Sequence, residues 1–271
     1  MTSIRLLRGA FGHLALLTAA SDFVTHAHAE HHIVIHIDGS PGVMKVADQL
    51  VCPGPAMAVG VNAFEPHSHS FGPGCPPGRF LAFYIRPDWV LRRHGLGLRL
   101  FRRTAVPLDD WLRRAVLELP DRHDADAGDL AEYEIERLID HLVEAAEIFS
   151  PRHPSGARAT SPTDHRVRKA IGLMGADVGS RIGLDEVARS VGLSRPHFFA
   201  LFKEQMNLTP NVYWNTLRME EACQQLQASD DSLTMVACSL GFTSQGNFTR
   251  FFRDHSGVTP TLYREAARAT G

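Results

Sequence analysis

The stretch that decides the fold is Ala237-Cys-Ser-Leu-Gly-Phe-Thr243, continued by Gly246-Asn-Phe248 and Phe251-Phe252. An earlier stretch repeats it as Ala188-Arg-Ser-Val-Gly-Leu-Ser194, continued by Pro196-His-Phe198 and Leu201-Phe202. The two copies are 49 residues apart up to the turn and 50 residues apart beyond it, and each is followed by Thr-Pro-x-x-Tyr. Because the whole pattern recurs with its apolar rhythm, the sequence contains two copies of one supersecondary unit.

Each copy has the parts of a helix-turn-helix. Gly192 and Gly241 fall at the turn, where glycine adopts a left-handed backbone without the steric cost of a Cβ. A hydroxyl residue then caps the second helix, Ser194 in the first copy and Thr243 or Ser244 in the second. The apolar positions of that helix face inward, so its other face is free to enter a DNA major groove.

The second copy extends to Ser239-Leu-Gly-Phe-Thr-Ser-Gln-Gly-Asn-Phe-Thr-Arg-Phe-Phe-Arg253, followed by Gly257-Val-Thr-Pro-Thr-Leu-Tyr-Arg264. This sequence resembles the signature of the AraC/XylS family of bacterial transcription regulators, and the resemblance covers about residues 165–268. It implies an α+β protein of two domains, an N-terminal cupin-like β-barrel with trailing helices and a C-terminal all-α domain of two helix-turn-helix units joined by a long helix. We therefore expect an effector-binding and dimerisation domain at 1–149, a linker at 150–163 and an AraC-type DNA-binding domain at 164–271.

Turn residues and apolar spacing give the same division. Short strands broken by Gly, Pro and Asp are expected at 11–18, 23–28, 33–38, 43–47, 57–61 and 79–86. Helices are expected at 108–119 and 130–149, and the apolar stripe of the second either docks on its own domain or forms a dimer seam. Beyond a Pro/Ser-rich linker, helices are expected at 164–174, 184–191, 195–206, 210–227, 233–240, 245–255 and 260–267. At about 1.5 Å per residue, the helix at 210–227 would be roughly 25 Å long and would let two recognition helices enter successive major-groove faces about 34 Å apart.

The resemblance also assigns residues to the DNA interface. Arg250 can address guanine and Gln245 adenine, whereas Phe199 and Ala200 offer only apolar contact to thymine methyl groups. We therefore expect the second unit to supply hydrogen-bonded specificity and the first to supply shape and phosphate anchoring. The complete expected set is Arg195, Pro196, His197, Phe199, Ala200, Lys203, Ser244, Gln245, Gly246, Asn247, Arg250 and Arg253, with Ser244 and Arg253 placed for phosphates.

A histidine cluster marks the N-terminal half, where seven of the fifteen histidines lie between residues 26 and 69. His26-x-His28, His32 and the following glycine match the spacing of the first metal motif of cupins, with His32 where that motif has glutamate. A later strand would bring His67. Three interpretations remain open: a divalent transition metal held by His26, His28, His32 and His67; an effector pocket lined by these residues and Glu30; or surface histidines. No cofactor is required by the sequence.

Composition limits the remaining choices. The chain holds 28 basic and 30 acidic residues, so a DNA-binding half must concentrate its cations on one face and gain affinity as a dimer. The four cysteines lack Cys-x-x-Cys spacing, which is typical of reduced thiols in a cytoplasmic protein. Residues 1–20 are interpreted as strand rather than a targeting signal, and no apolar run reaches spanning length.

The leading hypothesis is a transcription regulator, not an enzyme, whose promoter binding or activation is controlled by a small-molecule effector in the cupin-like domain. Its expected partners are double-stranded promoter DNA, the effector, RNA polymerase and a second copy of the chain, with no membrane. The alternative is a metal-dependent cupin enzyme with a helical appendage, which explains the histidines but not the duplicated motif. A protein-interaction module is a third hypothesis, disfavoured by the polar, cationic face at Gln245, Asn247 and Arg250.

Overall fold

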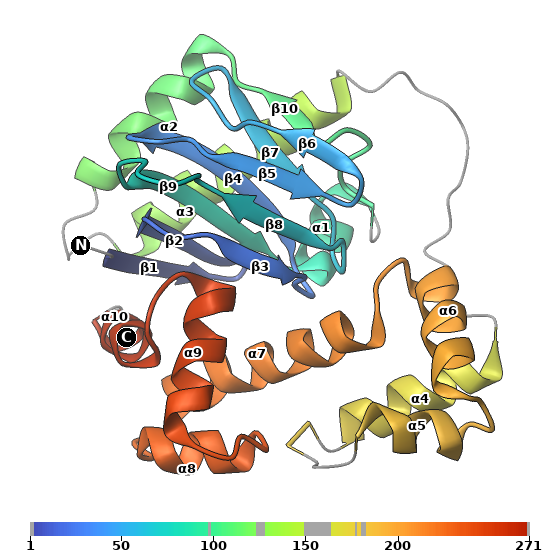
Figure 1. Ribbon diagram of the computed structural model, residues 1–271. Coiled ribbons are helices and arrows are strands. Elements are labelled where there is room, and N and C mark those ends of the chain that lie inside the picture. Colours follow the sequence, from blue (N-terminus) through green and yellow to red (C-terminus); the bar gives the residue numbers. More distant parts are fainter. Residues whose placement is uncertain are drawn as a thin grey trace.

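The computed structural model describes residues 3–96, 99–122, 128–148, 164–176, 178–179 and 183–269. Their first half is β-rich and their second half is helical (Figure 1), so the two-part α+β architecture predicted from the sequence is confirmed. The predicted linker at 150–163 lies outside the described residues.

The N-terminal half, called here the β domain, contains two antiparallel sheets. The six-stranded sheet has the order β1-β2-β9-β4-β7-β10 and the four-stranded sheet has the order β3-β8-β5-β6. The strands are β1 (Ser3–Gly9), β2 (Gly12–Ala19), β3 (Phe23–His26), β4 (His31–Asp38), β5 (Val43–Val46), β6 (Gln49–Val51), β7 (Met57–Val61), β8 (His67–Ser70), β9 (Gly78–Ile85) and β10 (Ala105–Pro107). Of these, β1, β6, β8 and β10 were not predicted.

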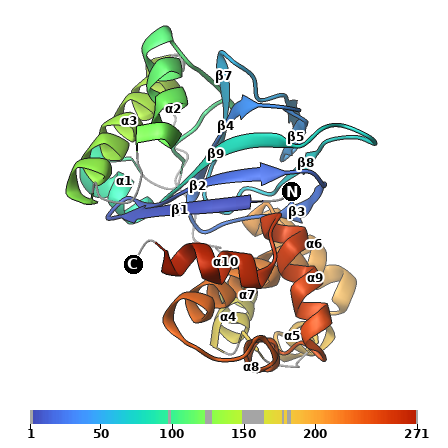
Figure 2. The same cartoon turned by 90° about the vertical axis from the view of Figure 1, so that its left-hand side faces the viewer.

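Helices cover one face of the larger sheet, as Figure 2 shows. They are α1 (Pro87–His94), which was not predicted, α2 (Asp110–Arg122) and α3 (Gly128–Ile148). Side chains alternate along β4: Ile33 and Ile35 pack toward the helices, whereas Val34 packs into the core that extends toward the C-terminal half. Both faces of this strand are therefore covered, which explains the near-continuous burial of residues 31–35.

The apolar stripe of α3 is docked on its own domain. Its inward positions join the core formed with the larger sheet and α2, and this buried set is Ile135, Leu138, Ile139, Leu142 and Val143. These apolar side chains are buried within the chain. The alternative in which they form a dimer seam is therefore wrong for this face of α3.

The C-terminal half contains seven described helices: α4 (His165–Ala176), α5 (Leu184–Ser190), α6 (Arg195–Met206), α7 (Pro210–Ala228), α8 (Leu233–Ser239), α9 (Gln245–Ser256) and α10 (Pro260–Arg268). The turn glycines have the expected left-handed backbone, with φ of 73° at Gly192 and 78° at Gly241. Ser244 caps α9, its side chain accepting a hydrogen bond from the Asn247 amide. Ser194 occupies the equivalent position before α6, but its side chain makes no cap hydrogen bond, so the expected capping role of Ser194 is wrong.

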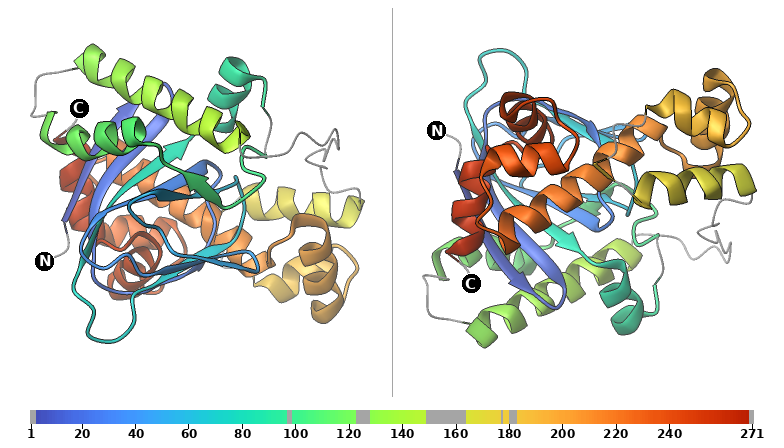
Figure 3. Two further views of the ribbon diagram at one scale, coloured as in Figure 1. Left: turned by 90° about the horizontal axis from the view of Figure 1, so that it is seen from above. Right: turned by 90° about the horizontal axis from the view of Figure 1, so that it is seen from below.

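The two halves are packed against each other. Helices α7 and α9 contact β3, and α10 lies along β1 (Figures 1 and 3). One apolar core runs through both halves, with Leu17 and Val34 of the β domain in the same cluster as Phe248 and Phe252 of α9. The hydroxyl of Thr216 in α7 also donates a hydrogen bond of 3.1 Å to the carbonyl of Ala27.

Candidate functional site

Two features of the molecule are candidate functional sites: the outer face of the helix-turn-helix pair and a cavity between the two halves. All but one of the residues expected to contact DNA are exposed, the exception being the half-buried Phe199. Helices α6 and α9 stand at opposite ends of α7 and both run upright in Figure 1. The 19 residues of α7 correspond to roughly 28 Å of helix. The structure therefore presents two separated polar helix faces, on α6 and α9, that are connected by the single helix α7.

In the first unit, neighbouring side chains hold Arg195 in place. The Arg195 guanidinium donates a hydrogen bond of 2.7 Å to Asp185 of α5. It also lies over the Phe199 ring at 5.0 Å. Both groups are exposed, so the ion pair contributes little to stability, yet it partly neutralises the charge that a phosphate would meet. Lys203, about two turns further along α6 than Arg195, is exposed.

The second unit has a more connected polar face. The Asn247 side-chain amide donates to the Thr243 hydroxyl at 2.8 Å, and the Thr234 hydroxyl donates to Gln245 at 2.9 Å. Arg250 donates to the Asn247 side-chain oxygen at 3.4 Å. Side chains that are held by neighbours lose less freedom when they bind a base edge, which favours precise readout.

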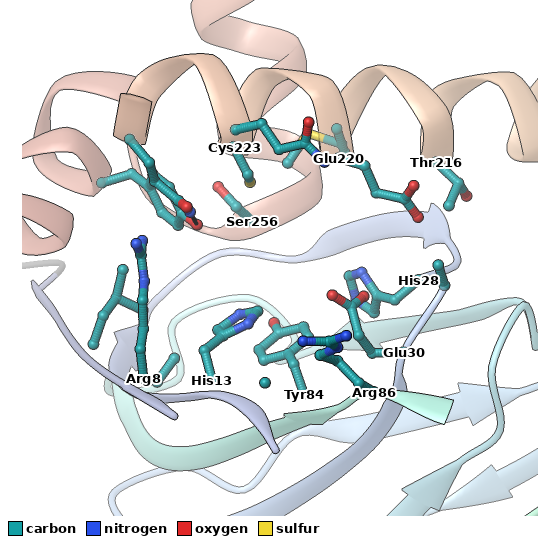
Figure 4. Close-up of a pocket in the computed structure, with 18 of the residues that line it drawn as sticks. Arg8, His13, His28, Glu30, Tyr84, Arg86, Thr216, Glu220, Cys223 and Ser256 are labelled. Carbon is teal, nitrogen blue, oxygen red and sulfur yellow. Dashed lines mark hydrogen bonds between the residues drawn. The ribbon is translucent and has the colours of Figure 1, made fainter. Parts of the chain in front are cut away.

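A cavity of about 520 Å³ lies between the β domain and the helical half. Its floor is formed by β1, β2 and β9 and by the loop before β4, and its roof by α7 with the ends of α9 and α10 (Figure 4). Apolar side chains on both sides, including Leu6, Leu17 and Met219, face it together with charged groups. Such a volume is in the range of small-molecule sites, which are mostly apolar with a few placed polar groups.

Two carboxylates enter this cavity from opposite sides. Glu30 comes from the loop before β4 and Glu220 from α7 (Figure 4). Burial, followed by the nearby charge of Glu30, raises the pKa of Glu220 to about 7. Burial likewise raises the pKa of Glu30. Burial and the nearby Glu30 carboxylate therefore both favour the protonated form of Glu220.

Two arginines, Arg8 and Arg86, line the same cavity. Arg86 is paired with Asp88 at 2.7 Å, whereas the structure describes no ion pair between Arg8 and any other described residue. Arg8 is therefore the cation best placed to meet an anionic group of a ligand.

The histidines divide between two cavities. His28 and Glu30 line the large cavity, whereas His26, His32 and His67 line an adjoining cavity of about 40 Å³ that also includes His255 of α9. Burial lowers the pKa of both His32 and His67 to about 3, so both rings are neutral near pH 7. His26, His32 and His67 are buried and His28 is half-buried, which removes the interpretation of these four as surface histidines.

Sequence reasoning missed residues on both sides of the cavity. Arg8 and Arg86 of the β domain and Glu220 and His255 of the helical half were not singled out, because they carry no motif and are brought together only when the two halves dock. The sequence signal was weak, because a single glutamate in a long helix is usually exposed to solvent.

Comparison with known proteins places this architecture in a class. A family model described as a helix-turn-helix domain matches residues 187–266. The probable transcription factor PqrA of Proteus vulgaris is 37% identical over 84 residues, covering 31% of this chain and 69% of PqrA. The regulatory protein PocR of Salmonella typhimurium is 34% identical over 108 residues, covering 40% of this chain and 36% of PocR. The chain thus spans about a third of the length of PocR.

A fold match covers both halves. ToxT of Vibrio cholerae, in an apo form, superposes with a TM-score of 0.57 at 12% identity, over 97% of this chain and 99% of ToxT. ToxT has also been solved with an unsaturated fatty acid bound, with a TM-score of 0.54, 13% identity and coverage of 97% of this chain and 94% of ToxT. The sequence matches and the paired helix-turn-helix units define a transcription-regulator class of protein. The chain belongs to the AraC/XylS family, as its sequence signature indicated.

Among the described residues, no helix is both long and apolar enough to cross a membrane.

Proposed function

We propose that the protein is a transcription regulator that binds promoter DNA through α6 and α9 and responds to a small molecule held between its two halves. The observation that carries this proposal is that α7, which joins the two helix-turn-helix units, also forms the roof of the 520 Å³ cavity. A ligand there would touch the β domain and the connecting helix at once. Sequence relatives that are transcription regulators support the DNA-binding part.

The DNA interface in this proposal keeps the residues inferred from the sequence. Gln245, Asn247 and Arg250 read base edges, while Arg195, Lys203 and Arg253 anchor the phosphates. The C-terminal half is only weakly basic, with 12 basic and 11 acidic residues from 164 to 271. Binding as a homodimer would compensate for this low charge, since each added phosphate contact increases affinity.

The effector in this proposal is an apolar small molecule with an anionic group. The cavity offers apolar walls at Leu6, Leu17 and Met219 and a cation at Arg8. ToxT, which shares the fold, has been solved with an unsaturated fatty acid, a ligand of the same general chemistry. An effector shifts DNA binding only if it binds two arrangements of the halves with unequal affinity. Contacts to both halves provide that difference.

The proposal extends to the working context of the protein. It acts without catalysis, in the cytoplasm, with RNA polymerase as the machinery it influences. Its domains are those inferred from the sequence, 1–149, 150–163 and 164–271.

The test is selection of bound DNA from a random pool by the full chain. We expect enrichment of two short boxes about one helical turn apart, since each recognition helix enters one major groove. A matched selection with the Arg250→Ala variant should lose enrichment mainly in the box read by α9. If the full chain enriches no sequence under low-salt conditions, the proposal is wrong. The effector part of the proposal is tested separately, by screening fatty acids and other apolar acids for a shift in the melting temperature of the protein.

A further inference from the structure

Three histidines converge where the β domain meets α9. His26 ends β3 and His67 begins β8, and the two are direct partners in the antiparallel pairing of these strands. His28 follows two residues after His26. One ring nitrogen from each of the three lies within 4.8 Å of the others. His32, expected from the sequence to be a further ligand, is not part of this triad, although its ring lies 5.2 Å from that of His28 and 5.5 Å from that of His67.

Hydrogen bonds indicate which ring nitrogen of His26 and of His67 carries the proton. The Nδ1 atom of His26 donates to the Val24 carbonyl at 2.7 Å, and that of His67 donates to the Glu65 carbonyl at 2.9 Å. Because a carbonyl only accepts, Nδ1 carries the proton and Nε2 of the neutral ring keeps a lone pair. Histidines that bind metals almost always hold their other ring nitrogen in this way.

Three histidine Nε2 atoms in this region are buried without hydrogen-bond partners. The Nε2 atoms of His28, His67 and His255 have no hydrogen-bond partner among the described residues. Buried polar atoms are nearly always satisfied, so several orphaned nitrogens around one point indicate a group that binds there. An adjoining cavity of about 40 Å³, lined by His26, His67 and His255, gives space for an ion.

The ring spacing fits a single ion. With nitrogen–metal distances of about 2.0–2.1 Å, two imidazoles on one tetrahedral ion have ring centroids about 5 Å apart. The observed centroid distances are 4.9 Å for His26–His28, 5.1 Å for His28–His67 and 4.3 Å for His26–His67. Only small adjustments of the rings are needed.

We propose that His26, His28 and His67 bind one divalent transition-metal ion of the Zn²⁺ class, and that His255 of α9 is the fourth ligand. The inference stands apart from the proposed DNA-binding role, because it concerns only how the β domain and α9 are joined. Neutral imidazoles suit Zn²⁺ and the neighbouring ions of the first transition row.

His255 has the same features as the other three. Its Nδ1 atom donates to the Phe251 carbonyl at 2.7 Å, and its ring lies 6.2 Å from that of His26. This is about 1 Å beyond the spacing of two ligands on one ion, so α9 would move slightly toward β3 when the ion binds. A bound ion would therefore link α9, the second recognition helix, to the β domain.

The experiment measures metal binding to the full-length, untagged protein after chelator treatment and dialysis. Zn²⁺ is titrated in competition with a chromophoric chelator, and Co²⁺ is added separately as a spectroscopic probe. We expect one ion per chain and the strong visible absorption of tetrahedral Co²⁺. The variants His28→Gln and His67→Gln should each lower Zn²⁺ affinity by at least about 100-fold, the upper range seen when even outer-shell partners are removed.

The matched control is His36→Gln, which changes a histidine of β4 that bonds to the Gly39 carbonyl instead; it should leave affinity unchanged. Circular dichroism confirms that each variant is folded, and the half-buried His28 serves if the His67 variant does not fold. Less than one ion per chain, or equal affinity in a folded His28→Gln variant and the His36→Gln control, overturns the site. His255→Gln should weaken binding about 10-fold or more and change the Co²⁺ spectrum. An unchanged spectrum overturns the link to α9.

Discussion

The two helix-turn-helix units share one sequence pattern but have different neighbours. The first unit forms its own core with α4 and the start of α7, in which Phe198 and Phe202 are fully buried. It meets the β domain at Phe64, whose ring lies 6.1 Å from that of Tyr213. The second unit shares one core with the β domain, through Phe248 and Phe252. The repeated sequence thus determines the local fold of each unit. The residues around each unit determine how it packs against the β domain.

This difference has a functional meaning. We expect a ligand or ion at the junction of the halves to act directly on the second unit, and to reach the first mainly through α7. Four predictions test how the two units differ and how the helical half is joined to the β domain.

The strongest test removes one buried ring from each unit. Phe202→Ala and Phe252→Ala should each lower the free energy of unfolding by about 3–5 kcal/mol, because each leaves a large cavity. Only Phe252→Ala should also reduce amide hydrogen-exchange protection in β3, since its ring belongs to the shared core. Equal loss of protection in β3 from both variants would show that the units are not energetically distinct.

The turn glycines give a second matched pair. Gly192→Ala should cost about 1–2 kcal/mol for the left-handed backbone alone, because a Cβ there meets nothing within 4 Å. At Gly241 a Cβ would lie 2.5 Å from the backbone carbonyl oxygen of Gly179. Gly241→Ala should therefore cost roughly 1–3 kcal/mol more, as overpacking does. Urea unfolding of both variants measures the difference, and equal midpoints would refute the close approach.

The third prediction compares the two DNA-reading faces. Arg250→Ala should weaken binding to the selected DNA by about 1–3 kcal/mol and relax its specificity. Arg195→Ala should weaken binding by about 1 kcal/mol or less and uniformly across sequences, since Arg195 is already paired with Asp185 and is assigned to phosphates.

The control for these variants is Arg268→Ala, which changes an exposed arginine of α10 paired with Asp230. It should leave DNA affinity unchanged in fluorescence-anisotropy titrations at a fixed salt concentration. Equal losses for Arg250→Ala and Arg195→Ala, with specificity retained, would mean that the second unit has no special part in base readout.

The fourth prediction concerns pH and Glu220. Burial and the nearby Glu30 charge raise its pKa in the folded protein to about 7 from the ordinary value of 4.5, so the folded state holds this proton more tightly than the unfolded state. The resulting stability is present below pH 4.5 and is lost as pH rises through about 7. Glu220→Gln should remove this loss and raise stability at pH 8, relative to the parent, by about 1–3 kcal/mol.

Melting temperatures at pH 5 and pH 8 measure this effect, with Glu221→Gln as the control on the same helix. A Glu220→Gln variant whose pH dependence matches that of the parent would show that Glu220 is ionised throughout.

Much of the helical half could be predicted from the sequence, and less of the β domain. The turn signals at Gly192 and Gly241 and the apolar repeat fix the helices through short-range rules. Strands such as β6 and β10 have three residues each and are too short to show alternation. Their partners lie far away in sequence, so only the folded sheet defines them.

The candidate sites were predicted to different degrees for the same reason. Spacing placed His26, His28 and His67 in one group, and the antiparallel pairing of β3 with β8 brings them together, although β8 itself was not predicted. It did not find His255 or Glu220, which reach the β domain only through docking of the two halves. The placement of His32 among the metal ligands stays a prediction, because its ring lies 5.2 Å from that of His28 as well as 4.4 Å from that of Tyr84.

The packing of α10 along β1 has a consequence for biosynthesis. Strand β1 (Ser3–Gly9) is synthesised before α10 (Pro260–Arg268), which packs along it. This outer strand of the larger sheet is therefore uncovered on that side while the intervening residues are made. Unpaired strand edges favour association between nascent chains. Faster synthesis of the C-terminal residues would shorten the interval in which this edge is uncovered.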